Sequence, residues 1–494
     1  MKRIFLCLIV AGLWGNVAVS ATTPHIMAYD LCATQSGNDF AFTFFANTQP
    51  IAGKLIFHTI TGDSIGEFTI KQQLHAGYNT ILLTSSDIPT TNSTIAWSLK
   101  LSAESNAQFG IIHESDVYNR AYVTINTHPE SDYFGHIYLA NRKGVGLCNI
   151  HVFDYQYHST FTTGNNYATF NSSSRPAIDS DGYVYWPDWG DLKSGITIMN
   201  PTDYSETQFF SGIQNNDNGA WYSSFTHTDL GSSSSGVSIY GTGKTTKLYA
   251  MNEDAGQYNQ LPKNGLVIYH IGNEDGTISH QWKTAPSQVV EIEDNNTNGN
   301  FAIAACSHGA WLCQHTLTNQ SGKYALMFYD HQGKRQYVSS DANLINGSNG
   351  AGIALNREEN QLAMVNANGN ILLFDITWLG DTPTLSLRTT YTTTFNAIGS
   401  MHFDYAGNLI TTSGNNFGGS KDDLRLVIYS TPIDHNTIIV PARQSQYIQR
   451  GEIDTSYPQL PLPNQSTPTK IIQDGNMYIL YHGKTYSILG FSII

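Results

Sequence analysis

The sequence predicts an all-β protein, with an N-terminal β-sandwich followed by a β-propeller of six or seven blades. Short runs rich in aromatic and β-branched residues recur along the chain, separated by turns rich in Gly, Asp and Asn. Charged residues make up only 13% of the 494 residues and aromatic residues 12%, a composition typical of many short strands joined by polar turns. No helical period competes between residues 120 and 445.

The first 21 residues have the pattern of a secretory signal peptide. Lys2 and Arg3 precede an apolar run over 4–13, and the small residues of 19–21 follow it. We therefore expect cleavage after Ala21 and an exported, secreted or cell-surface protein. The apolar run is too short to span a bilayer, and no later segment has 18 consecutive apolar residues, so no membrane insertion is expected. A net charge of -14 without Lys/Arg clusters argues against nucleic acid as a partner.

Residues 22–115 are predicted to form the sandwich. Glycine- and Asp/Asn-rich turns separate its strand-like runs, which cover 40–45, 53–57, 78–83 and 95–101. The order of a strand pair ending at 61–63, the stretch 75–80 and a final strand containing Trp97 resembles FlgD-like immunoglobulin-type domains. This resemblance implies a spacer or docking module and no chemistry.

Residues 116–450 are predicted to form the propeller. Each repeat has a polar turn, a first strand, and then a more apolar strand. The apolar strands recur at intervals of roughly 45 to 70 residues, which suits a four-stranded blade with insertions. Six repeats indicate six blades, and the long interval between Ile196 and Leu266 leaves room for a seventh. The apolar strands cover 151–154, 196–199, 266–269, 326–330, 371–375 and 426–429.

Several segments of this region resemble known propellers. The stretch 179–190 resembles an NHL-type blade, in which a D-x-x-G turn leads into an aromatic strand. The stretches 134–141, 403–409 and 426–432 are similar to exported propeller proteins of anaerobic Gram-negative bacteria. Both resemblances imply an architecture rather than an activity.

The C-terminal region divides into a linker and a compact tail. Four prolines between 458 and 468 predict a semi-extended linker over 451–469. Residues 470–494 are predicted to form a β tail of two strands and a tight turn, and they resemble the sorting-type tail of the same bacterial proteins. Because this tail ends in Phe-Ser-Ile-Ile, where a polar finish is commoner, a strand pair that docks on the propeller is the alternative.

One acidic cluster and one group of aromatic residues are candidate sites. Asp179, Asp181, Asp188 and Asp191 could supply oxygen ligands to calcium, although turn chemistry is the favoured reading of Asp179 and Asp181; no other cofactor is expected. Trp186, Trp189 and Trp311, with His308, could line a propeller mouth and stack on sugar rings. The favoured alternatives are that the tryptophans fill gaps between blades and that His308 is a turn residue.

The four cysteines outside the leader do not form an obvious disulfide framework. They are Cys32, Cys148, Cys306 and Cys313. If residues 308 and 309 form a two-residue hairpin turn, Cys306 faces Trp311 and Cys313 faces Ala304, so the two thiols are not opposite each other. The pairing of the cysteines stays open.

These features favour an exported, non-enzymatic binding or scaffold protein whose ligand is a glycan or a surface or extracellular protein. The alternative is a propeller enzyme, a lyase or hydrolase acting on polysaccharide or a lactone. That alternative requires three or more candidate acids and histidines to converge in the fold. The candidates are Asp179, Asp181, Glu253, Asp254, Glu291, Glu293 and His308.

Overall fold

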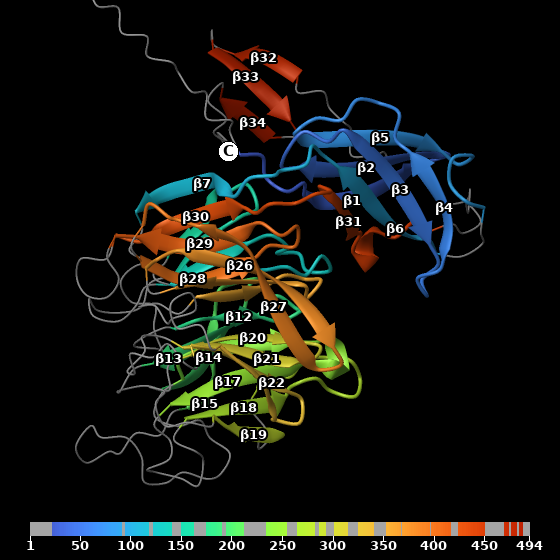
Figure 1. Ribbon diagram of the computed structural model, residues 1–494. Coiled ribbons are helices and arrows are strands. Elements are labelled where there is room, and N and C mark those ends of the chain that lie inside the picture. The colour runs from blue at the N-terminus through green and yellow to red at the C-terminus, as the bar shows by residue number, and fades with distance from the viewer. Residues whose placement is uncertain are drawn as a thin grey trace, which may run out of the picture.

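In the computed structural model, the regular secondary structure of the described residues is almost entirely β-strand (Figure 1). Its short 3₁₀ turns include η1 (Gly243–Thr245) and η3 (Gln444–Gln446). Among the residues that the structure describes, no helix has the length and apolar character needed to cross a membrane. The described residues are 22–90, 94–117, 122–140, 150–162, 174–189, 194–211, 234–253, 264–281, 286–292, 301–314, 325–339, 352–366, 368–395, 397–415, 423–449, 469–473, 476–481 and 484–487.

The N-terminal region is a sandwich of two antiparallel sheets, as predicted. One sheet has the order β1-β2-β5, with β1 (Ala28–Ser36), β2 (Asp39–Ala46) and β5 (Gly77–Thr84). The other has the order β31-β6-β3-β4, with β31 (Thr437–Pro441), β6 (Ala96–Ser102), β3 (Ala52–His58) and β4 (Ser64–Thr69). The four runs predicted as strands lie in β2, β3, β5 and β6.

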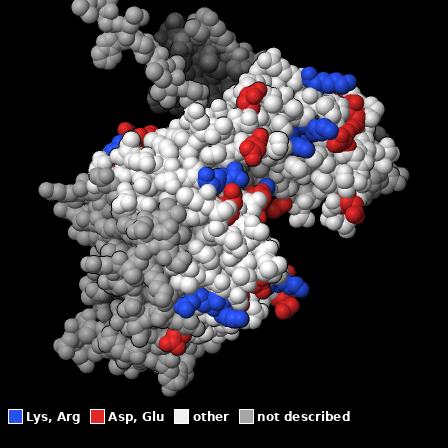
Figure 2. Space-filling model, viewed as in Figure 1, with Lys and Arg blue, Asp and Glu red and all other residues white. Residues whose placement is uncertain are grey.

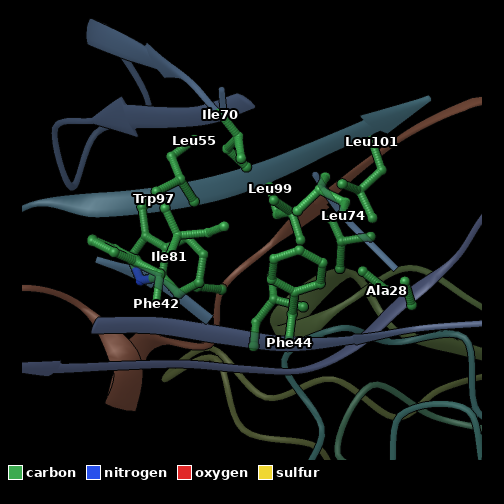
Figure 3. Packing of buried hydrophobic residues seen from close by; sticks show 14 of the residues in the cluster. Ala28, Phe42, Phe44, Leu55, Ile70, Leu74, Ile81, Trp97, Leu99 and Leu101 are labelled. Carbon is green, nitrogen blue, oxygen red and sulfur yellow. The ribbon is translucent and has the colours of Figure 1, made fainter. Parts of the chain in front are cut away.

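The sandwich core lies between these two sheets (Figure 3). Phe42 and Phe44 point inward from β2 and are fully buried, because alternate residues of a strand face the same side of a sheet. Trp97 of β6 meets Phe42 edge to face, with ring centroids 4.9 Å apart. The Trp97 indole also donates a hydrogen bond to the carbonyl of Gln446, 2.8 Å away. This bond fixes the 3₁₀ turn η3, which follows β31, to the sandwich core.

The described residues between 110 and 430 form six four-stranded antiparallel sheets, here called blades 1 to 6. The inner strands contact one another in a closed cycle from blade 1 to blade 6, which makes the region a propeller. From the innermost strand outward, blade 1 contains β8 (Tyr122–Ile125), β9 (Ile137–Ala140), β10 (Ile150–Phe153) and β11 (Ser159–Thr162), and blade 2 contains β12 (Ala177–Ile178), β13 (Val184–Trp189), β14 (Ser194–Met199) and β15 (Glu206–Ser211). Blade 3 contains β16 (Val237–Tyr240), β17 (Lys247–Glu253), β18 (Asn264–His270) and β19 (Gln288–Glu291), and blade 4 contains β20 (Phe301–Cys306), β21 (Gly309–Gln314), β22 (Leu326–Asp330) and β23 (Arg335–Val338). Blade 5 contains β24 (Ile353–Leu355), β25 (Gln361–Val365), β26 (Ile371–Leu379) and β27 (Thr382–Tyr391), and blade 6 contains β28 (Ala397–Phe403), β29 (Leu409–Gly414), β30 (Arg425–Ser430) and β7 (Gly110–Val117).

The apolar runs in the sequence mark the third strand of every blade. All six overlap β10, β14, β18, β22, β26 or β30. These strands are apolar along their whole length because each blade is covered on both faces by its neighbours. Leu326–Asp330, for example, is buried at every position, and its residues divide between the cores that blade 4 shares with blades 3 and 5.

Two strands lie outside the regions in which the sequence placed them. β7, which the predicted boundary between residues 115 and 116 divides, is the outermost strand of blade 6 and pairs with β30. β31, which falls in the predicted propeller range, pairs with β6 in the sandwich. In both cases a strand from one end of the chain covers the edge of a sheet from the other end, and so satisfies backbone groups that would otherwise be exposed.

The C-terminal tail contains three strands where two were predicted. β32 (Thr469–Gln473), β33 (Asn476–Tyr481) and β34 (Lys484–Ser487) form one antiparallel sheet. Residues 1–21 and most of the predicted linker lie outside the described residues.

The three described cysteines, Cys32, Cys306 and Cys313, are free. In the β20–β21 pair, Cys306 lies opposite Gly309 and Cys313 opposite Ala302. The turn residues are therefore 307 and 308, not 308 and 309, so the predicted register was wrong by one turn position. The conclusion that the two thiols do not face each other still holds. Cys148 lies outside the described residues.

Candidate binding site at the channel mouth

The inner strands of the six blades surround the propeller axis and run along it in the same direction. Their C-terminal ends, and the turns that follow them, therefore meet on one side of the propeller, which we call the hairpin face. This face includes the turns over 126–136, 179–183, 241–246, 307–308, 356–360 and 404–408.

A cavity of about 180 Å³ lies on the axis beneath this face, and all six inner strands or their following turns line it. Two histidines, His128 after β8 and His402 in β28, contribute to the wall. Burial lowers the pKa of His402 to about 4 and also lowers the pKa of His128, with a nearby Asp179 acting in the opposite direction. Both rings are thus neutral at pH 7. The other lining residues are Thr124, Ile125, Thr127, Ala177, Ile178, Ser238, Ile239, Ile303, Ala304, Ala305, Ile353, Ala354, Leu355 and Phe403.

Asp179 is a buried carboxylate at the turn between β12 and β13. Its Oδ1 accepts hydrogen bonds from the backbone N–H groups of Asp181 and Tyr183, both at 3.0 Å. Its Oδ2 accepts from the Tyr185 hydroxyl at 3.0 Å and lies 2.9 Å from Nε2 of His280. The His280 ring also stacks on Tyr183, with centroids 3.7 Å apart. The carboxylate thus ties blade 2 to the loop between β18 and β19 of blade 3.

This geometry bears on the predicted calcium ligands. Protein donors surround both oxygens of Asp179, so its turn role accounts for its position. Asp181 is half exposed, 4.0 Å from Nε2 of His280. The side chain of Asp188 and all of Asp191 lie outside the described residues. Within the described residues, no three His, Cys, Asp or Glu side chains are grouped to hold a metal ion.

The predicted tryptophan platform is not presented to solvent at two of its three positions. Trp186 is 0% exposed in the core between blades 1 and 2, and Trp311 is 0% exposed in the core between blades 4 and 5. Both rings pack in the gaps between blades and are closed to solvent. The side chain of Trp189 lies outside the described residues.

His308 lies in the two-residue turn between β20 and β21. Its Nδ1 is 3.1 Å from Oδ1 of Asp381, and its ring stacks on Trp378 with centroids 4.1 Å apart. Both partners belong to the β26–β27 hairpin of blade 5. His308 is therefore a turn residue that holds this hairpin against blade 4.

The residues required by the enzyme alternative do not gather as a group among those described. Asp179 and Asp181 lie together, but Glu291 is exposed on the outer strand β19 and His308 belongs to blade 4. The side chain of Glu253, and Asp254 and Glu293, lie outside the described residues. The histidine that does join Asp179 is His280, which the sequence reasoning missed. It is 101 residues away in the chain, and no local motif marks it.

Two projections border the hairpin face. The sandwich stands over blades 6 and 1, where the hydroxyl of Tyr405 donates to the carbonyl of Ile439 and the ring of Phe134 packs edge to face on Tyr405. Arg443, which follows β31, also pairs with Asp132 of the β8–β9 loop. On the other side, β26 and β27 extend to 9 and 10 residues and form a hairpin beyond the blade, with Leu379 at its tip 85% exposed.

Contacts between neighbouring blades fix the rim of this face. Glu359 of blade 5 accepts a hydrogen bond from the backbone N–H of Ser307 in blade 4 at 2.9 Å. The guanidinium of Arg357 lies 4.0 Å from the ring centroid of Tyr405 in blade 6. Figure 2 shows small patches of both charges where the sandwich meets the propeller, and a recess between them. In this view, the described part of the face therefore carries charges of both signs.

Comparison with known proteins found no family and only solved structures of low identity and low TM-score. No family model matches the sequence, and no curated protein matches it. Similar solved structures include the WD40 repeats of RRP9, with 11% identity, a TM-score of 0.39, and coverage of 66% of this chain and 98% of that one. A structural-genomics protein of unknown function from Bacteroides thetaiotaomicron has 10% identity and a TM-score of 0.39, covering 83% and 98%. A catalytically inactive virginiamycin B lyase from Staphylococcus aureus has 12% identity and a TM-score of 0.37, covering 66% and 100%.

Proposed function

We propose that this chain is an exported, non-enzymatic binding or scaffold protein that receives a protein partner on the hairpin face. A general binding or scaffold role is what a propeller fold supports, because loops from every blade converge around one axis. The partner would lie between the sandwich and the β26–β27 hairpin, with the channel mouth beneath it.

The observation that carries this proposal is the exposure of apolar side chains on both borders of the face. Leu379 at the hairpin tip is 85% exposed, and Ile439 on the edge strand β31, whose carbonyl meets Tyr405, is 44% exposed. Apolar anchors within a polar rim are typical of surfaces that bind proteins. The burial of Trp186 and Trp311 makes a glycan the less favoured ligand.

Site-specific photo-cross-linking tests this proposal. A photoreactive amino acid is placed at Leu379 or at Ile439 in the mature protein, with Ile60 as a matched exposed apolar control on the sandwich. The labelled protein is incubated with the surface and secreted fractions of the producing cells. We expect the same protein to be cross-linked from 379 and 439 and not from 60. Equal labelling from all three positions, or none from 379 and 439, would contradict the proposal.

Export is a separate part of the proposal and has its own test. The leader pattern of residues 1–21 predicts a mature chain that begins at Thr22. Mass spectrometry of the protein from the producing cells should find that N-terminus, and protease added to intact cells should degrade the protein. A retained leader would contradict export by this route. The immunoglobulin-type resemblance of the sandwich and the sorting role of residues 470–494 stay predictions.

One observation favours the enzyme alternative, a lyase or hydrolase acting on polysaccharide or a lactone. A carboxylate that accepts a hydrogen bond from an imidazole orients the ring, and His280, with 22% of its side chain exposed, is so placed against Asp179. Activity towards a panel of polysaccharides and lactones would support this alternative only if His280→Ala abolishes it while the protein stays folded. Activity unaffected by that substitution would exclude His280 as its base.

A further inference from the structure

We propose that the axial cavity binds a small uncharged molecule with hydrogen-bonding groups along one edge. This site lies below the face assigned to the protein partner and has a different ligand.

The charge of the cavity wall decides the charge of the ligand. None of the described lining residues is Asp, Glu, Lys or Arg, and the two lining histidines are neutral at pH 7. An ion that entered this cavity would lose much of its hydration without meeting an opposite charge on the wall. A neutral molecule does not bear that cost.

The polar part of the wall lies mainly on blades 6 and 1, which are neighbours in the ring. His402 of β28 and Thr127 and His128 after β8 belong to it. A neutral imidazole has one donor nitrogen and one acceptor nitrogen, so the rings of His128 and His402 each supply both kinds of group to the wall. The Thr127 hydroxyl both donates and accepts. A ligand edge with a donor beside an acceptor, as in a primary amide, matches these groups.

The wall formed by blades 3 to 5 is mainly apolar. Ile239 of β16, Ala305 of β20 and Leu355 of β24 line it, each partly exposed to the cavity. Ser238 adds one hydroxyl, which accepts a hydrogen bond from the N–H of Ala305 at 3.0 Å. The ligand therefore has an apolar body opposite its polar edge. A volume of about 180 Å³ is smaller than the pockets that hold drug-sized ligands, and suits one substituted six-membered ring.

Three probes of equal size and different charge test the inference. Benzamide is neutral, benzoate is an anion and benzamidine is a cation at pH 7.5. Binding to the mature full chain is followed by NMR of the histidine rings and by saturation transfer to the probe. We expect saturable shifts of the His128 and His402 signals with benzamide, and affinities at least tenfold weaker for the two ions. Equal or tighter binding of either ion would overturn the inference, as would the absence of any saturable shift with benzamide.

Variants that fill the cavity locate the site. Ala305→Phe, and Leu355→Trp from the neighbouring blade, should each weaken benzamide binding at least tenfold. Thr242→Phe is the matched control, because Thr242 is exposed on the same face but does not line the cavity. Benzamide affinity that survives both cavity variants, each with native thermal unfolding, would overturn the inference. Cross-linking from position 379 should be unchanged in these variants, so failure of one proposal is distinguishable from failure of the other.

Discussion

Ser102 and Thr437 lie opposite each other in the β6–β31 pair, with their hydroxyl oxygens 2.9 Å apart, although 335 residues separate them in the chain. The chain therefore leaves the sandwich after β6, builds the propeller, and returns to complete the sandwich. Blade 6 is closed in the same way, because β7 precedes the first blade and pairs with β30 of the last. The sandwich and the last blade are therefore each completed by a strand from the opposite end of the chain.

Because β31 pairs with β6, we expect the stability of the sandwich core to depend on β31. Val440 of β31 is 1% exposed and belongs to the sandwich core. Val440→Ala should lower the free energy of unfolding by about 1–3 kcal/mol, because it removes buried methyl groups and leaves a cavity. Denaturant titration followed by tryptophan fluorescence measures the change.

The neighbouring residue supplies the control. Ile439 is on the same strand but points outward and is 44% exposed, so Ile439→Ala should change the free energy of unfolding by no more than about 0.5 kcal/mol. Similar losses in the two variants would show that β31 does not pack on the sandwich as described.

Asp179 and Asp181 should differ sharply in their effect on stability. Asp179→Ala removes an acceptor used by two backbone N–H groups, by Tyr185 and by His280, and should cost about 2–4 kcal/mol of unfolding free energy. Asp181→Ala removes a half-exposed carboxylate and should cost about 0.5 kcal/mol or less. Addition or removal of calcium should leave the melting temperature of the wild type unchanged; a calcium-dependent rise lost in Asp179→Ala would contradict the turn role.

Burial of His402 in the folded protein should lower the free energy of unfolding in mild acid. An unfolded histidine has a pKa of about 6.5, whereas burial lowers the pKa of folded His402 to about 4. Between these values the unfolded chain binds more protons than the folded one. Above about pH 6.5 the neutral ring costs the folded protein no stability. As the pH falls towards 4, the free energy of unfolding falls by about 1–3 kcal/mol, because the unfolded chain takes up the proton first. His128 acts in the same direction.

The pH dependence of unfolding in the variant His402→Gln tests this origin. Its free energy of unfolding should fall less than that of the wild type between pH 7 and pH 4.5. In the folded wild type, the NMR signal of the His402 ring should not titrate above pH 5. A His402 pKa near 6.5 in the folded protein would contradict the prediction.

The free cysteines should differ in reactivity. Burial raises the pKa of Cys306 and of Cys313 to about 12, so very little thiolate is present at pH 8. Cys32 is only partly buried. In the mature chain, which lacks Cys7, a Cys148→Ser variant keeps only the three described cysteines, and maleimide should label Cys32 at least about 100-fold faster than the other two thiols. Fast labelling of Cys306 in the folded protein would show that blade 4 opens at its β20–β21 turn.

The candidate site was less predictable than the fold because its contacts are not local. Asp179 stood out in the sequence because a D-x-x-G turn has a recognisable spacing. Its partner His280 comes from a loop of the next blade, and the loops there have no fixed length. For the same reason the sequence could not show that Trp311 faces the gap between blades 4 and 5 rather than the solvent.

The sequence by itself determined the strands, since strand formation depends on patterns a few residues long. The alternating run at 40–45 and the continuous apolar run at 326–330 identify a half-buried and a fully buried strand, respectively. Only the tertiary structure decided which edges meet: β31 with β6, β7 with β30, and the six inner strands around one uncharged cavity. Those pairings join residues hundreds of positions apart, because any exposed edge offers the same backbone groups. Closure of the ring and burial of the core select among them.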